Sequence, residues 1–215
     1  QNGFEIKETT RNTDSYEASQ DLLAYYGMAD LRFNDLFGLT GGLRFEDSGI
    51  EIDSVDRFGN NINNELDTDD VFPSLSGTWF INGSDETKLS LAYSQTVNRP
   101  DFKEFAEAPY IDPVSRLEVE GNSELEKTTI DSYDLRFEHF FSDSENFSIS
   151  LFYKDFSKPI EKIQSPSASQ KSTFVNTKEA KNYGLEVEAL KYLGFLDDSL
   201  EPFYLGGNFS LIESE

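Results

Sequence analysis

The stretch from Lys88 to Phe156 decides the fold through three segments: Lys88-Leu-Ser-Leu-Ala-Tyr-Ser-Gln-Thr96, Tyr133-Asp-Leu-Arg-Phe-Glu138 and Phe147-Ser-Ile-Ser-Leu-Phe-Tyr-Lys154. In each segment, large apolar side chains alternate with small or charged ones. Because successive side chains of a β-strand point to opposite faces, each segment is expected to form a strand with one apolar and one largely polar face. Three such strands in succession, with aromatic residues on the apolar face, indicate a wall between lipid and water.

The same alternation continues on both sides of this stretch. It predicts eight strands in all, over residues 18–34, 36–47, 71–81, 87–97, 128–141, 146–156, 173–191 and 203–211. Pro73 is expected at the start of the third strand, where a missing backbone N–H is tolerated. No α-helical period of useful length and no alternation of strands with helices is present, so an all-β, antiparallel up-and-down fold is predicted.

The connections between the predicted strands alternate in length. Short connections cover 34–36, 82–86, 142–145 and 192–199, and long connections cover 48–70, 98–127 and 157–172. An ordinary meander has no reason to place its short and long connections on opposite edges. A bacterial outer-membrane barrel does, because it has short periplasmic turns and long outer loops.

Composition removes several classes of function. The formal net charge of −23 argues against a nucleic-acid partner, because phosphate repels an acidic surface. The chain has no cysteine and one histidine, which excludes a cysteine nucleophile and argues against a multi-histidine metal site. No apolar run reaches the ~20 residues of a spanning helix. A mean hydropathy of −0.54 is compatible with a β-barrel, in which only alternate strand residues meet lipid.

Four segments, taken in order, carry a resemblance to a known family: Ser94-Gln-Thr-Val-Asn-Arg-Pro-Asp-Phe-Lys-Glu-Phe105, Gly121-Asn-Ser-Glu-Leu-Glu-Lys-Thr-Thr-Ile-Asp-Ser-Tyr-Asp-Leu-Arg-Phe-Glu138, Leu151-Phe-Tyr-Lys-Asp-Phe-Ser-Lys-Pro-Ile-Glu161 and Asn182-Tyr-Gly-Leu-Glu-Val-Glu188. In sequence, order and spacing they resemble the barrel of TonB-dependent outer-membrane receptors. Ser123 departs from the family, which often has proline after Gly-Asn.

The resemblance implies a transmembrane barrel of about 22 strands in the outer membrane of a Gram-negative cell, with a plugged lumen. Residues 1–215 are then expected to be an internal, partial barrel of about eight strands, without the plug domain, the TonB-contacting box or the terminal aromatic strand. The implied function is TonB-dependent, energy-coupled uptake of a scarce ligand such as an iron-siderophore or an oligosaccharide. Its partners would be outer-membrane lipid, the plug and TonB, and it would be neither an enzyme nor a cofactor-binding protein.

Two other functions fit the strand pattern. Eight strands can close on their own side chains, so the chain could form a self-contained outer-membrane anchor or adhesin. A soluble, secreted, glycan-binding β-sandwich would also alternate apolar and polar residues. Dependence on detergent would separate the sandwich from both membrane proteins.

Candidate ligand contacts lie in the loop that follows the fourth predicted strand. They are Arg99, Phe102, Phe105, Tyr110 and Arg116. Each has a structural alternative: Arg99 can pair with Asp101 or Glu104 nearby, and the aromatic residues can pack the loop against itself, as in compact surface loops.

The polar face of the strands supplies the candidate lumen residues. These are Arg44, Glu46, Asp134, Arg136, Glu138, Lys154, Glu186 and Glu188, whose mixed signs indicate cross-strand pairs or contacts to a plug. Trp79 and His139 are expected at the membrane interface near the short turns. The acidic residues Asp67, Asp69 and Asp70 lack a calcium-binding motif and are expected in a solvated loop, with no metal bound.

Overall fold

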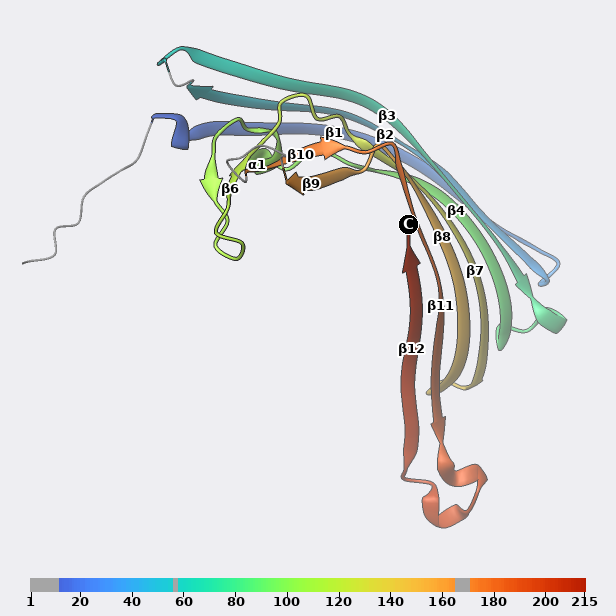
Figure 1. The fold of residues 1–215 in the computed structure, drawn as a ribbon. Helices are drawn as coiled ribbons and strands as arrows, with labels where there is room; N and C mark the ends of the chain where they lie inside the picture. The colour runs from blue at the N-terminus through green and yellow to red at the C-terminus, as the bar shows by residue number, and fades with distance from the viewer. Residues whose placement is uncertain (1–11, 56–57, 165–170) are drawn as a thin grey trace, which may run out of the picture.

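A computed structural model describes residues 12–55, 58–164 and 171–215 and contains one strongly curved, eight-stranded antiparallel sheet (Figure 1). In order across the sheet, the strands are β1 (Tyr16–Phe33), β2 (Phe37–Val55), β3 (Asn61–Phe80), β4 (Thr87–Asn98), β7 (Thr128–Ser142), β8 (Glu145–Ser157), β11 (Glu179–Tyr192) and β12 (Tyr204–Ser214). This sheet confirms the predicted all-β, up-and-down wall of eight strands.

The two longest connections fold into a second, smaller sheet on the concave side of the first (Figure 1). It comprises β5 (Tyr110–Ile111), β6 (Glu118–Glu120), β10 (Ser172–Asn176) and β9 (Ile160–Gln164), and is preceded by the short helix α1 (Phe102–Phe105). We call the described parts of 99–127 and 158–178 the loop unit. The turns at the opposite edge include the 3-10 segments η2 (Ile81–Gly83), η3 (Leu193–Phe195) and η4 (Asp198–Leu200), and η1 (Asn12–Asp14) precedes β1. Within the described residues, no helix is long and apolar enough to cross a membrane.

Rows of paired residues cross the sheet and have a constant character. One row on the convex face consists of Leu31, Leu39, Gly77, Leu91, Leu135, Leu151, Leu185 and Leu211. A neighbouring row on the concave face consists of Arg32, Gly38, Thr78, Ser90, Arg136, Ser150, Glu186 and Ser210. The predicted division of residues between an apolar and a polar face is therefore confirmed across all eight strands.

Aromatic side chains border the leucine row on both sides. Tyr93, Tyr133, Tyr153 and Tyr183 pair in succession toward the loop unit, and the Tyr93 and Tyr133 ring centroids lie 5.1 Å apart. Toward the short turns, Phe37 stacks on Trp79 at 6.4 Å. Two aromatic rows that flank an aliphatic band are typical of a transmembrane barrel, and Trp79 lies near a short turn as predicted.

The prediction of a long loop over 48–70 is wrong, because β2 and β3 run through most of these residues as a long hairpin. In the membrane-facing part, Phe45 and Val71 lie on the convex face; farther along, Ile50 and Ile52 lie buried on the concave face. The strand registers are continuous, so the environment changes while the strand geometry does not. From here on, the apolar residues lie on the concave face and the polar residues on the convex face. The sequence pattern therefore does not continue the one seen in the membrane-facing part, and the strands were not predicted here.

Two further strand boundaries differ from the predictions. Pro73 lies within β3 instead of at its start, and the pairing of β3 with β4 begins at the next residue, Ser74. Pro73 is tolerated there because β3 has a sheet neighbour, β2, on one side only at that point. The predicted strand 173–191 is two strands in two sheets, β10 and β11, because the chain turns between Asn176 and Glu179.

The leucine row provides a test of which face meets lipid. We expect Leu211→Arg to destabilise the intact receptor in lipid vesicles by about 2–4 kcal/mol, because the charge would enter hydrocarbon. Ser210→Arg is the control, since Ser210 precedes Leu211 and lies on the polar face opposite Glu186. Denaturant unfolding would measure both, and an equal cost for the two variants would contradict the assignment of faces.

Candidate functional site

The loop unit has its own hydrophobic core, which it shares with the wall. Phe105, Val119 and Leu125 are 0–2% exposed and lie in one cluster with Ile50 and Ile52 of β2. The rest of the buried cluster is Ala106, Ala108 and Phe174, with Tyr16, Leu66, Phe102, Tyr110 and Ile160 packed at its edge. The two long loops therefore form one packed body seated on the concave face of β2 and β3.

Two short motifs join the halves of this body. Gly121 lies so close to the chain before it that an added Cβ would come within 2.0 Å of the Ala106 carbonyl oxygen. The next residue, Asn122, donates its side-chain amide to the Phe174 carbonyl oxygen at 2.9 Å. From the other loop, the Asn176 amide donates to the carbonyl oxygens of Glu126 and Lys158, at 2.9 and 2.7 Å. These contacts explain why a glycine followed by asparagine is required at 121–122.

A cluster of charges lies where the loop unit meets the wall. Arg99 donates to Glu46 of β2 at 2.9 Å, and to Asp70 and Thr68 of β3 at 2.8 and 3.1 Å. Lys127 forms a second ion pair with Asp70. The side chains of Arg99, Glu46 and Asp70 are only 10–12% exposed. We call Glu46, Asp70, Arg99 and Lys127 the ionic cluster.

The ionic cluster corrects the partners expected for Arg99. Asp101 and Glu104 do not pair with it; instead, the backbone N–H of Asp101 donates to the Glu104 carboxylate at 2.9 Å at the start of α1. Glu46 and Asp70 lie 53 and 29 residues from Arg99, so the sequence near Arg99 gives no sign of these partners. Asp70 was also expected in the predicted loop 48–70, whereas it lies in β3.

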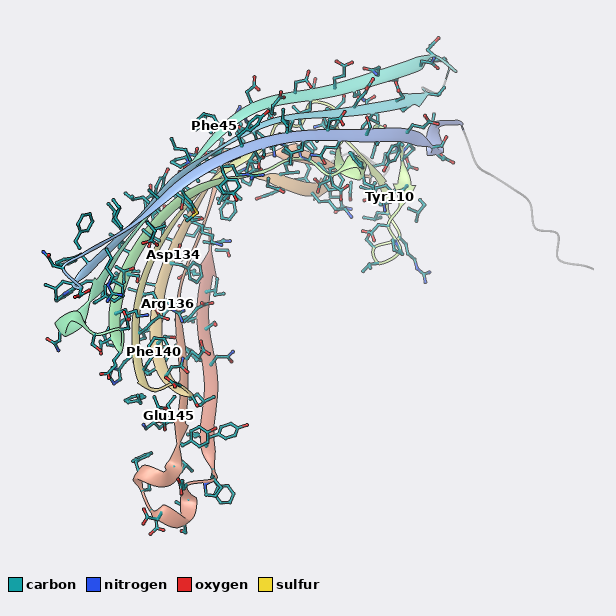
Figure 2. The ribbon with its side chains drawn as sticks, turned by 180° about the vertical axis from the view of Figure 1, so that it is seen from behind. Phe45, Tyr110, Asp134, Arg136, Phe140 and Glu145 are labelled. Atoms are coloured by element: carbon teal, nitrogen blue, oxygen red, sulfur yellow. The ribbon has the colours of Figure 1, made fainter. Side chains whose placement is uncertain are left out.

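The predicted ligand contacts occupy different environments. Phe105 is 1% exposed, so its side chain packs the core and has no surface free for a ligand. Phe102 and Tyr110 lie at the edge of the core, as the packing alternative proposed, and Figure 2 shows Tyr110 in the loop unit on the concave side. Arg116 is exposed at the β5–β6 turn with a φ of 58°. Ligand contact by Phe102, Tyr110 and Arg116 stays a prediction.

The β5–β6 turn is held in shape by Asp112. Its carboxylate accepts from Lys162 of β9 at 2.6 Å and from the backbone N–H of Val114 at 2.9 Å. The Lys162 ammonium, followed by these backbone donors, holds the pKa of Asp112 well below its ordinary value, so Asp112 remains charged at neutral pH. Within the residues that the structure describes, Arg116 at the same turn forms no ion pair. The turn thus exposes a cation on a rigid base.

The predicted lumen residues share the concave face of the sheet. Arg136 donates to Ser150 and Ser148 at 3.1 and 3.3 Å and pairs with Glu138 at 2.9 Å. The strand registers place the whole predicted set on this face: Arg44, Glu46, Asp134, Arg136, Glu138, Lys154, Glu186 and Glu188. Arg136 pairs with an opposite charge only along its own strand, through Glu138, and its contacts across to β8 are to the hydroxyls of Ser148 and Ser150. Within the described strands, a cross-strand pair of opposite charge at Arg136 is therefore not seen.

The described wall also contains a hollow of about 490 Å³ beside the ionic cluster. Arg44, Phe72, Ser94 and Thr96 lie in its lining, together with Arg99. Over the same described ranges, no three histidine, cysteine, aspartate or glutamate side chains are arranged to hold a metal ion. The three aspartates of β3 are divided between faces, because Asp67 and Asp69 are exposed while Asp70 belongs to the ionic cluster.

Comparison with known proteins identifies the family. The family model described as "TonB dependent receptor-like, beta-barrel" matches residues 2–214. The chain belongs to this family of transport receptors, and its strands form part of an outer-membrane barrel of a Gram-negative bacterium. No curated protein sequence matches the chain.

Solved structures share the fold at low sequence identity. The unliganded ferric citrate transporter FecA superposes with a TM-score of 0.70 at 16% identity, over 93% of this chain and 27% of that one. The siderophore receptor PiuA from Acinetobacter baumannii gives 0.66 at 14% identity, over 93% and 26%. The ferric yersiniabactin uptake receptor FyuA from Yersinia pestis gives 0.59 at 18% identity, over 93% and 28%. The chain therefore spans little more than a quarter of these three structures.

The core of the loop unit can be tested apart from the wall. We expect Phe105→Ala to destabilise the loop unit by about 3–5 kcal/mol, because it leaves a cavity at a fully buried position. Amide hydrogen exchange in the intact receptor should then accelerate in 102–126 and stay unchanged in β7 and β8. Val114→Ala is the control, since Val114 is 91% exposed. Equal protection of 102–126 in the two variants would show that the loop unit is not built on this core.

Proposed function

We propose that this chain supplies part of the wall and outer mouth of a receptor for TonB-dependent, energy-coupled uptake of a ferric chelate. One observation carries the proposal: two long loops form a single packed body over the concave face at one end of the barrel wall. A packed body can present its surface residues in a fixed arrangement, which lowers the entropic cost of capturing a ligand.

The proposed ligand class rests on charge and on the kind of protein that shares the fold. Arg116 offers an exposed guanidinium on the turn braced by Asp112, suited to bidentate contact with the carboxylates or hydroxamates of a chelator. Tyr110, at the edge of the loop core, supplies a nearby aromatic ring on an adjoining strand. Ferric citrate, a siderophore and ferric yersiniabactin are named for the three solved structures above. An oligosaccharide is the second candidate, favoured by the aromatic residues of the loop unit.

Passage beyond the mouth would follow the concave face. Its hydrated residues, including Arg136, Glu138 and Glu186, would line the lumen beside a plug domain supplied by the rest of the receptor. Movement of that plug on contact with TonB would open the path, so the cycle requires binding and displacement and no bond chemistry. In the described chain β1 and β12 are the two edges of an open sheet, which argues against a self-contained eight-stranded barrel.

Removing the charge at the mouth tests the proposed capture. We expect Arg116→Asn to weaken binding of an anionic ferric chelate to the intact receptor by about tenfold, or 1.4 kcal/mol. Asparagine tolerates the positive φ of this position, so the variant removes the guanidinium without straining the turn. Titration of a panel of ferric siderophores and neutral oligosaccharides would measure affinity.

The matched control lies at the opposite end of the wall. Asp143→Asn changes one charge in the short turn between β7 and β8 and should leave ligand affinity unaltered. If Asp143→Asn weakened binding and Arg116→Asn did not, the ligand would enter at the other end. Oligosaccharide binding without any chelate binding would replace the proposed ligand class.

A further inference from the structure

The backbone ladder of the wall is interrupted beside the loop unit. β3 and β4 pair from Phe80–Lys88 up to Ser74–Ser94, and the pairing stops there. β3 nevertheless continues to Asn61 with β2 as its partner, and β4 continues to Asn98 with β7 as its partner. The residue at the branch point is Pro73, which has no N–H to offer a neighbouring strand. The wall therefore has a seam between β3 and β4 above this level.

The ionic cluster spans this seam. Arg99 follows β4 directly and reaches across to Glu46 and Asp70 on the far side. Lys127 immediately precedes β7 and pairs with the same Asp70. Both ends of the loop 99–127 are thus tied to one carboxylate on the neighbouring hairpin, where backbone hydrogen bonds no longer join the two parts of the wall.

Because these charged side chains are largely buried, removing one partner of a pair has a high energetic cost. Asp70 is 10% exposed and has Arg99 and Lys127 as its cations, and a largely desolvated carboxylate that loses its cations is strongly destabilised. Glu46, 11% exposed, pairs with Arg99 and also with Arg44 at 2.7 Å, so it depends less on Arg99. Arg99 directs its three donor nitrogens Nε, Nη1 and Nη2 at three different acceptors, a geometry that the single ammonium of lysine does not reproduce. The Arg99 guanidinium is therefore committed to the wall.

We propose that Arg99 and Lys127 are positioning residues that lock the loop unit across the β3–β4 seam and so fix the orientation of the mouth. Any effect of Arg99 on ligand capture would then be indirect, through the position of the β5–β6 turn. This consequence for capture rests on the proposed function. The lock itself does not, because it requires only the wall and the loop unit.

The lock can be measured without a ligand. Spin labels at Val114→Cys, on the exposed β5–β6 turn, and at Glu51→Cys, on the exposed outer face of β2, would report the distance between loop unit and wall in the intact receptor. We expect one narrow distance distribution in the parent protein. Asp70→Asn should broaden and shift it, because both loop ends lose their shared carboxylate. Asp69→Asn is the matched control, since it removes the same charge from the adjacent, outward-facing residue.

Graded variants separate a lock from general destabilisation. Arg99→Lys should restore the narrow distribution only in part, and Lys127→Met should shift it less than Arg99→Gln, because it leaves the Arg99 pairs in place. Heat-modifiable gel mobility would confirm that each barrel assembles. If Asp70→Asn did not assemble, Lys127→Met would decide alone, since Lys127 is the more exposed cation and has one carboxylate partner.

The possible results test the lock separately from the proposed role of the loop unit in ligand capture. An unchanged distribution in assembled Asp70→Asn or Lys127→Met would overturn the lock, even if chelate binding fell. A shifted distribution would support it. A shifted distribution with unaltered chelate affinity would keep the lock and contradict the proposed role of the loop unit in capture.

Discussion

The side chains of a β-strand alternate strictly, and the strand cannot exchange its two faces without an extra residue. β2 and β3 keep one continuous register from the short-turn end to the far end of the hairpin, although they pass from lipid into water. The sequence must therefore reverse its polarity within the strand. Phe45 faces outward where the outside is lipid, and Ile52 faces inward where the inside is the loop core.

This reversal determines where the loop unit can sit. Beyond the membrane-facing rows, the only large apolar surface that β2 and β3 present is concave, so a packed loop must lie over the lumen. The outward positions there are acidic, and Asp47 and Asp69 pair across the strands with both side chains exposed. Like charges directly opposite one another repel, which is tolerable only in water. The acidic outer face of the hairpin thus marks the level at which the wall leaves the hydrocarbon.

Patterns that repeat locally could be predicted from the sequence, and partnerships across long separations could not. The eight strands and their faces follow from period-two alternation, which the leucine and tyrosine rows satisfy at β4, β7, β8 and β11. The extended hairpin was missed because its alternation changes sign. The partners of Arg99 were missed because Glu46 is 53 residues away, and only the fold brings the two side chains together. The short strands β9 and β10 carry too few residues to show a period.

The wall and the loop unit are held by different forces, and the seam is where the two meet. Within lipid, every backbone polar group needs a partner, so β3 and β4 pair without interruption through the leucine row. Above lipid, water can satisfy the backbone, and the strands are free to separate. There, side-chain contacts replace the backbone hydrogen bonds between β3 and β4. An apolar core provides most of the packing between loop unit and wall, and the four charges of the ionic cluster fix the orientation of the loop unit. Apolar packing has little directional preference, whereas a guanidinium with three acceptors has a definite geometry. The orientation of the mouth therefore depends on the ionic cluster, although the apolar core is the larger contact.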